Sequence, residues 1–143
     1  MTEQALSRWP IPQAGVLATH LQISPNVAEC AAFYRDVLGA TLLMPGPPAI
    51  LQLFNTWLQI AEPGGPTDDK PEVDAIPADP VRMSSALNLR VADIHEVYER
   101  WKQAGADFLT EPKRHASEWR CYFRDPGGHL VEVGQATRVP TDD

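Results

Sequence analysis

RCYFRDPGGHLVEVGQ, residues 120–135, predicts two β-strands joined by a tight turn, and this hairpin decides the fold. Residues 120–124 are rich in aromatic and β-favouring side chains. The turn is Asp125-Pro126-Gly127-Gly128, in which proline fixes an early φ and the glycines accept a positive φ. In the second strand, residues 129–135, alternation places Glu132 opposite two valines that can pack on a core. Strands are depleted in glutamate, so Glu132 marks a candidate site.

Composition bounds the class of protein. The 143 residues suffice for one domain with a proper core, and 43% hydrophobic residues are typical of a soluble globular protein. A net charge of −7 argues against a nucleic-acid partner. No apolar run is long enough to span a membrane, and the first residues lack a signal pattern, so we expect no membrane contact and a cytoplasmic location. Cys30 and Cys121 are expected to be buried thiols rather than a disulfide framework.

The remaining pattern repeats the order strand, helix and three strands. Asp93 and Glu96 have the spacing of a capping box at the start of the second helix, and Gly39 and Gly105 are expected to end the two helices. The expected elements are strands at 16–23, 41–44, 49–54, 57–61, 86–91 and 107–110 and helices at 27–38 and 93–104, with a hairpin turn at Asn55-Thr56 and a loop at 111–117.

These elements predict five segments. They are an N-terminal leader (1–15), a first βαβββ module (16–61), a proline-rich acidic linker (62–85), a second βαβββ module (86–136) and a C-terminal tail (137–143). The fold class is therefore expected to be α+β, with the two modules forming a cupped mixed sheet around a shared cleft and the helices outside.

The two modules superpose without gaps over their first part at an offset of 66, which matches Leu21 with Leu87 and Gly39 with Gly105. In the same comparison His20 matches Ala86, and Gln59 matches Glu132 in the last strands. The match predicts that these four positions meet in the cleft: His20, Gln59, Ala86 and Glu132.

In these features the chain resembles the vicinal oxygen chelate superfamily, the group of glyoxalases, bleomycin-resistance proteins and extradiol dioxygenases. The resemblance lies in FYRDVLGA (33–40), WKQAGADFL (101–109) and YFRDPGGHLVEV (122–133), and with the strands around them it spans most of residues 16–135. The last motif is the most specific. The segments around 67–71 and 84–94 look like those of an uncharacterised bacterial branch of glyoxalase-like proteins.

The resemblance implies a divalent metal held by the first and last strands of each module. Carried over, the metal ligands are His20, Gln59 and Glu132, whose nitrogen and oxygen donors suit Zn, Ni, Mn or Fe. The fourth position is Ala86, which has no donor. A metal-dependent lyase, isomerase or dioxygenase acting on a substrate with adjacent oxygens is the first functional hypothesis.

The second hypothesis is a metal-free drug- or metabolite-binding protein without turnover, similar to the bleomycin-resistance members. Trp57 and Tyr122 would then offer aromatic faces, Asn88 and Arg120 polar contacts, and Glu132 a partner for a cationic group. In both hypotheses the partner is a small-molecule ligand. A homodimer is the expected assembly, with the modules paired within one chain or exchanged between two.

Overall fold

The computed structural model describes residues 10–137. The chain divides into two compact units, Met1–Ala78 and Asp79–Asp143. This division falls inside the segment that the sequence marked as a linker. Residues 1–9 of the expected leader and 138–143 of the expected tail lie outside the described residues.

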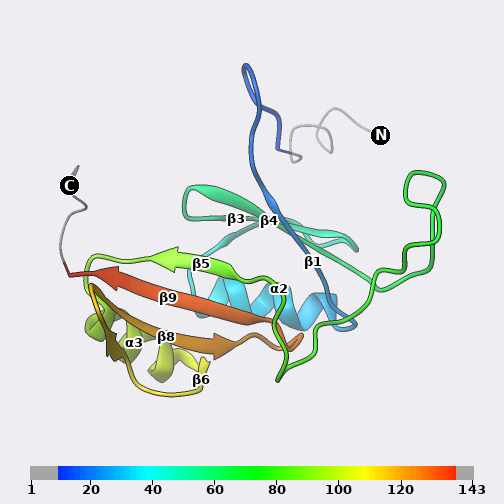
Figure 1. The fold of residues 1–143 in the computed structure, drawn as a ribbon. Helices are drawn as coiled ribbons and strands as arrows, with labels where there is room; N and C mark the ends of the chain where they lie inside the picture. The colour runs from blue at the N-terminus through cyan, green and yellow to red at the C-terminus, as the bar shows by residue number, and fades with distance from the viewer. Residues whose placement is uncertain (1–9, 138–143) are drawn as a thin grey trace. The chain divides into compact units, whose positions relative to one another are not determined.

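Within residues 10–78, the first unit contains one helix and one four-stranded sheet (Figure 1). The sheet has the order β1-β4-β3-β2; β1 runs parallel to β4, and the other neighbours are antiparallel. Its elements are β1 (His20–Ile23), α2 (Val27–Asp36), β2 (Thr41–Met44), β3 (Ala49–Leu53) and β4 (Thr56–Ala61). Helix α2 packs on β3 and β4 through Cys30 and Tyr34, both fully buried.

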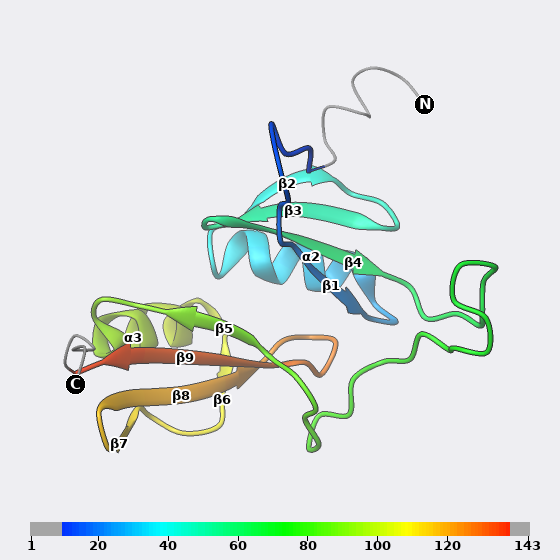
Figure 2. The same cartoon turned by 45° about the horizontal axis from the view of Figure 1, so that its top comes forward.

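The second unit repeats this arrangement with one addition (Figure 2). Its sheet has the order β5-β9-β8-β6, with a short strand, β7, paired to β8. Its elements are β5 (Leu87–Arg90), α3 (Ile94–Ala104), β6 (Asp107–Phe108), β7 (Lys113–His115), β8 (Glu118–Arg124) and β9 (Leu130–Ala136). Two βαβββ modules, the second with an added strand, confirm the predicted α+β class.

The boundaries of α3 follow from its sequence. The Asp93 carboxylate accepts a hydrogen bond from the Glu96 backbone N–H at 3.2 Å, which confirms the predicted cap. Gly105 ends the helix in the left-handed conformation at φ 119°, which glycine adopts without strain. One face of the helix carries Trp101, whose ring meets Phe123 of β8 edge-on at 6.1 Å between centroids. The core of this unit therefore lies between α3 and one face of its sheet.

Several expected boundaries were wrong. The first strand begins at His20 instead of Val16, and the turn between β3 and β4 is at Phe54-Asn55, where Phe54 takes φ 53°. The expected loop at 111–117 contains β7, an edge strand whose Lys-Arg-His sequence carries no apolar alternation. Among residues 10–137, neither α2 nor α3 is long and apolar enough to cross a membrane.

The gapless repeat was also wrong, by one residue. The two helices begin at Val27 and Ile94, 67 positions apart, while Gly39 and Gly105 are 66 apart. The first module therefore has one extra residue between the start of its helix and the glycine that follows it. From the first strand to the start of the helix, matching positions of the two modules are therefore 67 residues apart, not 66. A shift of one residue moves every side chain of a strand to the opposite face, so the error changes which side chains of β1 match those of β5.

Candidate functional site

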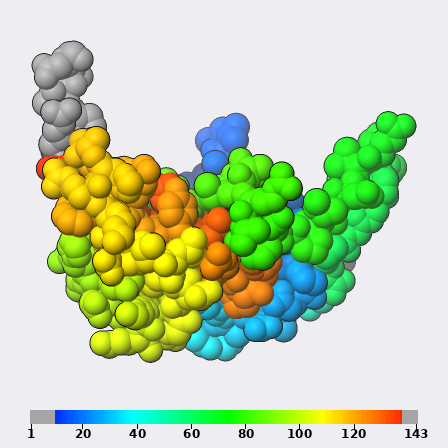
Figure 3. Space-filling model, turned by 60° about the horizontal axis from the view of Figure 1, so that its bottom comes forward, coloured from blue at the N-terminus to red at the C-terminus, as the bar shows by residue number. Residues whose placement is uncertain are grey.

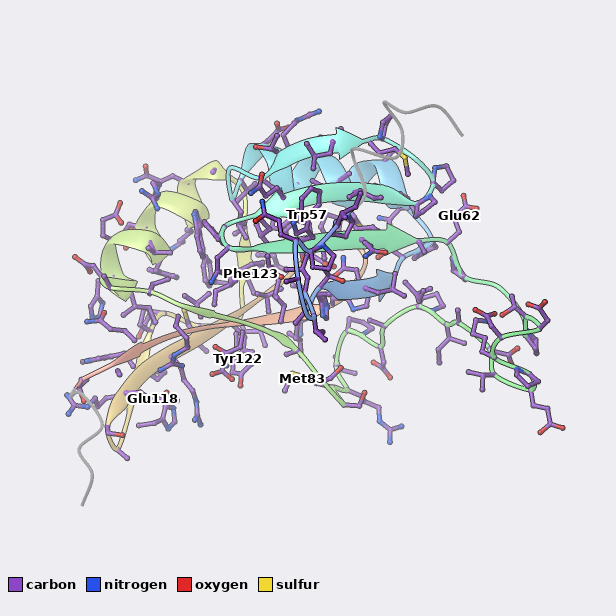
Figure 4. All side chains as sticks on the ribbon, turned by 90° about the horizontal axis from the view of Figure 1, so that it is seen from above. Trp57, Glu62, Met83, Glu118, Tyr122 and Phe123 are labelled. Carbon is purple, nitrogen blue, oxygen red and sulfur yellow. The ribbon has the colours of Figure 1, made fainter. Side chains whose placement is uncertain are left out.

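A group of polar side chains covers the face of the second sheet opposite α3. Alternation separates the two faces of β8 and β9: Phe123, Val131 and Val133 are buried on the helix side. Glu132 therefore points to the other face, as the sequence predicted. We call this surface the polar face and define it by Asn88, Arg90, Glu118, Arg120, Tyr122 and Glu132. Figure 4 labels two of them, Glu118 and Tyr122, on β8.

Glu132 lies at the centre of the polar face, on the strand between β5 and β8. Its two cross-strand partners both donate to its carboxylate: the Tyr122 hydroxyl to Oε2 at 2.6 Å, and the Asn88 amide to Oε1 at 3.1 Å. The side chain is only 18% exposed. Hydrogen bonds to a charged acceptor are short and strong, so the two neighbours fix the position of this carboxylate.

Arg90 connects Glu132 with a second carboxylate. Its guanidinium lies 2.9 Å from Glu118 Oε2 and 3.8 Å from Glu132 Oε1. Arg120 approaches the other oxygen of Glu118 at 3.4 Å. The hydrogen bond from Arg90 is the main reason that the pKa of Glu118 is lowered, so this carboxyl stays ionised in weak acid.

Gly134 makes room for the Arg90 guanidinium. A Cβ added at Gly134 would lie 2.0 Å from Arg90 Nη1 and 2.7 Å from its Cζ. The guanidinium is therefore in contact with the backbone of β9, at a place where any larger residue would displace it. Glycine is found in strands where another group approaches the backbone closely.

Tyr122 remains a hydrogen-bond donor at neutral pH. Its hydrogen bond to Glu132 raises the pKa of the phenol, and partial burial adds to the effect.

The thiol of Cys121, on the opposite side of β8, is inert, because burial raises its pKa to about 11. Neither Cys30 nor Cys121 forms a disulfide, and both are buried, as expected. The chemistry available on this sheet is therefore that of the carboxylate, phenol and guanidinium groups of the polar face.

In the first module, the structure separates two residues that the sequence placed together. His20 is the cross-strand partner of Leu58, which is buried on the side of the helix, while Gln59 is the partner of Leu21. Partners across a ladder project to the same face, so His20 and Gln59 lie on opposite faces of β1 and β4. The Gln59 amide donates to the Thr19 hydroxyl at 3.3 Å. The predicted common face was wrong because of the one-residue shift in the repeat.

The other first-module candidate, Trp57, shares the face of Gln59 by alternation along β4 and is partly buried. Both are on the face opposite α2. The aromatic face that the sequence predicted for ligand stacking is thus on the same side of β4 as the Gln59 amide. Its role in ligand binding stays a prediction.

The donor set around Glu132 does not fit a resident divalent metal. Among residues 10–137, no group of three or more His, Cys, Asp and Glu side chains is placed to hold a metal ion. The neighbours of Glu132 within its own module are an amide, a phenol and a guanidinium, and a cationic guanidinium at 3.8 Å opposes a second cation. At the offset of 67, the position of β5 that matches His20 is Leu87, which supplies no donor, and Ala86, the match expected from the sequence, supplies none either.

Three members of the site were missed at the sequence level. Arg90 shares alternation with Asn88, and Glu118 shares it with Arg120, so extending each predicted face by two residues would have found both. The sequence placed Gly134 on the correct face but carried no signal for its role, because that role depends on where the Arg90 side chain lies.

Comparison with known proteins identifies the family. Residues 17–133 match the model of the Glyoxalase/Bleomycin resistance protein/Dioxygenase superfamily. A relative, metallothiol transferase FosB from Shouchella clausii (strain KSM-K16), is 30% identical over 115 residues, which are 78% of this chain and 74% of the relative.

Two solved structures share the fold at low sequence identity. A glyoxalase/bleomycin resistance protein/dioxygenase from Nocardioides has a TM-score of 0.70 and 18% identity, covering 97% of this chain and 94% of its own. Fosfomycin resistance protein FosX from Mesorhizobium loti has a TM-score of 0.60 and 16% identity, covering 87% of this chain and 95% of its own. The resemblance that the sequence motifs indicated is confirmed: this chain belongs to the Glyoxalase/Bleomycin resistance protein/Dioxygenase superfamily.

Proposed function

We propose that this protein binds a polar small molecule and that the polar face of its second sheet is the binding site. The observation that carries the proposal is the position of Glu132. This carboxylate is in the middle of a sheet, mostly buried, and held by Tyr122 and Asn88 from the two adjacent strands. Stability alone does not explain a glutamate at this position, because strands disfavour glutamate and ion pairs on a surface contribute little to stability.

The polar face offers both kinds of hydrogen-bonding group to a ligand. Glu132 and Glu118 supply acceptors, while Arg90 and Arg120 supply donors and remain 46% and 39% exposed. Two carboxylates and two guanidinium groups balance in charge. This balance favours a ligand that carries donors and acceptors together, rather than the purely cationic group that Glu132 alone suggested. Because the side chains already hold one another, ligand binding requires little ordering of the site.

A metal-dependent enzyme is the second candidate, favoured by the relation to a protein named as a metallothiol transferase. In this version, Gln59 and Glu132 would supply ligands, without His20, which lies on the face opposite Gln59. Zn, Ni, Mn or Fe would act as a Lewis acid on a substrate with adjacent oxygens. The donor set described above supports this candidate less well, since Arg90 lies where a metal at Glu132 would be repelled.

A thermal-shift screen separates the candidates. The purified protein is heated with divalent ions alone and with a library of small polar and aromatic compounds that contains no metal. The proposal predicts stabilisation by compounds and not by ions, with the compound effect lost in Glu132→Gln. The matched control is Glu96→Gln on α3, a carboxylate outside the polar face, which should keep the response.

The opposite outcome favours the metal-dependent candidate. Stabilisation by one transition metal, together with about one equivalent of that metal in protein purified without chelator and its loss in Gln59→Ala, would reject the metal-free version.

A further inference from the structure

The segment 79–86 crosses one end of the polar face, and we call it the strap. The Arg124 guanidinium donates from Nε to the Pro80 carbonyl at 2.9 Å. Arg124 shares the face of Tyr122 by alternation along β8, so Pro80 lies on the polar side of β8. Because β9 lies between β8 and β5, the strap passes over the start of β9 before the chain enters β5 at Leu87. At the centre of Figure 3, green atoms of the strap border orange atoms of the β8–β9 hairpin.

The strap and the sheet beside it form an apolar end of the polar face. Leu130 begins β9 and is the cross-strand partner of Arg124, in the row next to Tyr122. Met83 of the strap is 49% exposed. Figure 4 shows Met83, Tyr122 and Glu118 in this order along the second sheet. A thioether, an aliphatic side chain and an aromatic ring therefore lie together at this end, and such side chains bind apolar groups.

The other end of the polar face is a row of cations. Arg90 and Arg120 are the cross-strand partners of Gly134 on its two sides. Lys113 of β7 is in turn the partner of Arg120. Because Gly134 has no side chain, the sheet is open between the two arginines, and the Arg90 guanidinium lies over the backbone there. Among residues 10–137, Arg120 has one ion pair, with Glu118 at 3.4 Å, so most of its N–H donors are open to a ligand.

The charges beside these guanidinium groups favour a ligand group with a single negative charge. A planar carboxylate accepts two parallel N–H donors from one guanidinium, which fixes its orientation. Glu118 and Glu132 lie beside the same groups, 2.9 and 3.8 Å from Arg90. A phosphate group with two negative charges would be repelled by these carboxylates more strongly than a carboxylate would be.

We propose that the ligand of the polar face is a small carboxylic acid with an apolar group at its other end. Its carboxylate binds Arg90 and Arg120, and its apolar group lies at Met83 of the strap. The two ends are separated along β9 by residues 130–134, which rise by about 13 Å in a strand. Glu132 lies halfway and accepts a hydrogen bond from a hydroxyl or amino group of the ligand. This inference rests on the proposed function, because it names the class of molecule for that same site.

Three probes of similar shape test the inference. Phenyllactate carries a carboxylate, a hydroxyl and an aromatic ring, phenyllactamide lacks the charge, and phenethyl phosphate carries two charges. Each probe is titrated into the full chain labelled with nitrogen-15, and the side-chain amide of Asn88 reports binding at the polar face. We expect phenyllactate to bind about tenfold more tightly than either of the other two, because it alone makes a charge-assisted contact without added repulsion.

Two variants assign the ends of the ligand. Arg120→Gln should weaken phenyllactate about tenfold and phenyllactamide by less than about threefold, whereas the control Arg100→Gln on α3 should change neither. Met83→Ser should weaken the acid and the amide alike, because both place the ring at the strap. Its control is Val73→Ser, at an exposed apolar residue of the first unit. Circular dichroism confirms that each variant is folded.

Three outcomes would overturn the inference: equal affinity for the acid and its amide, tighter binding of the phosphate, or no shift of the Asn88 signal with phenyllactate. If another compound of the library nevertheless shifts this signal, the proposed binding site stands and only the class of ligand is wrong. If compounds that stabilise the protein never shift it, the proposed function itself fails.

Discussion

Removing the Tyr122 hydroxyl tests whether Glu132 is held as the structure shows. Tyr122→Phe leaves Glu132 Oε2 without its donor at 2.6 Å while keeping the aromatic ring. A hydrogen bond to a charged group contributes about 1.5–3 kcal/mol to stability. Because the Glu132 side chain is 18% exposed, a water molecule can replace part of the lost hydrogen-bond energy. We therefore expect the free energy of unfolding to fall by about 1–2 kcal/mol. Urea unfolding followed by tryptophan fluorescence measures it.

A double-mutant cycle assigns this loss to the contact itself. Glu132→Gln keeps the shape of the side chain and removes its charge, so the two substitutions should be non-additive by about 0.5–1.5 kcal/mol. Tyr98→Phe is the matched control. Tyr98 is on α3, where its ring packs against Phe108, and it should not couple to Glu132→Gln. Additivity of Tyr122→Phe and Glu132→Gln within about 0.3–0.5 kcal/mol would refute the reasoning.

Neighbouring contacts give three further predictions. Gly134→Ala should displace Arg90, so that NMR titration finds the pKa of Glu118 closer to its ordinary value, with stability changed by less than about 1 kcal/mol. Because the pKa of Glu118 is lowered in the folded protein, this carboxylate stabilises the fold above about pH 4.3, and the stabilisation is lost as the pH falls through its pKa in the folded state. In Glu118→Gln, the free energy of unfolding should therefore fall less steeply as the pH is lowered. Asp125→Ala should cost about 1–3 kcal/mol in urea unfolding and speed amide exchange at His129, whose N–H donates to Asp125 Oδ1 at 3.0 Å; unchanged exchange would contradict this.

Local chemistry explains what the sequence could predict. The hairpin of β8 and β9, the cap at Asp93 and the glycine after α3 each depend on a few adjacent residues, and each was confirmed. The alternation of Val131, Glu132 and Val133 was equally local. Because alternation needs only the order of residues along one strand, it placed the central carboxylate on the correct face.

The sequence-based predictions that were wrong or incomplete depended on strand register or on contacts between residues distant in sequence. One extra residue in the first module was invisible in the repeat, because the match of Gly39 with Gly105 concealed it. The contact of Arg90 with Gly134 joins neighbouring strands far apart in sequence, so no local pattern signals it. The convergence of the two modules on a shared cleft stays a prediction. A joint role of His20 and Glu132 in that cleft disagrees with the position of His20 on the helix side of its sheet.

The central claim, that the polar face binds the ligand, is tested most directly at the side-chain amide of Asn88. This amide donates to Glu132 Oε1 and gives its own signal in an NMR spectrum of nitrogen-15-labelled protein. On titration with a compound that stabilises the protein, we expect a saturating shift of the Asn88 signal. A compound that saturates the protein while the Asn88 signal stays in place would contradict the claim.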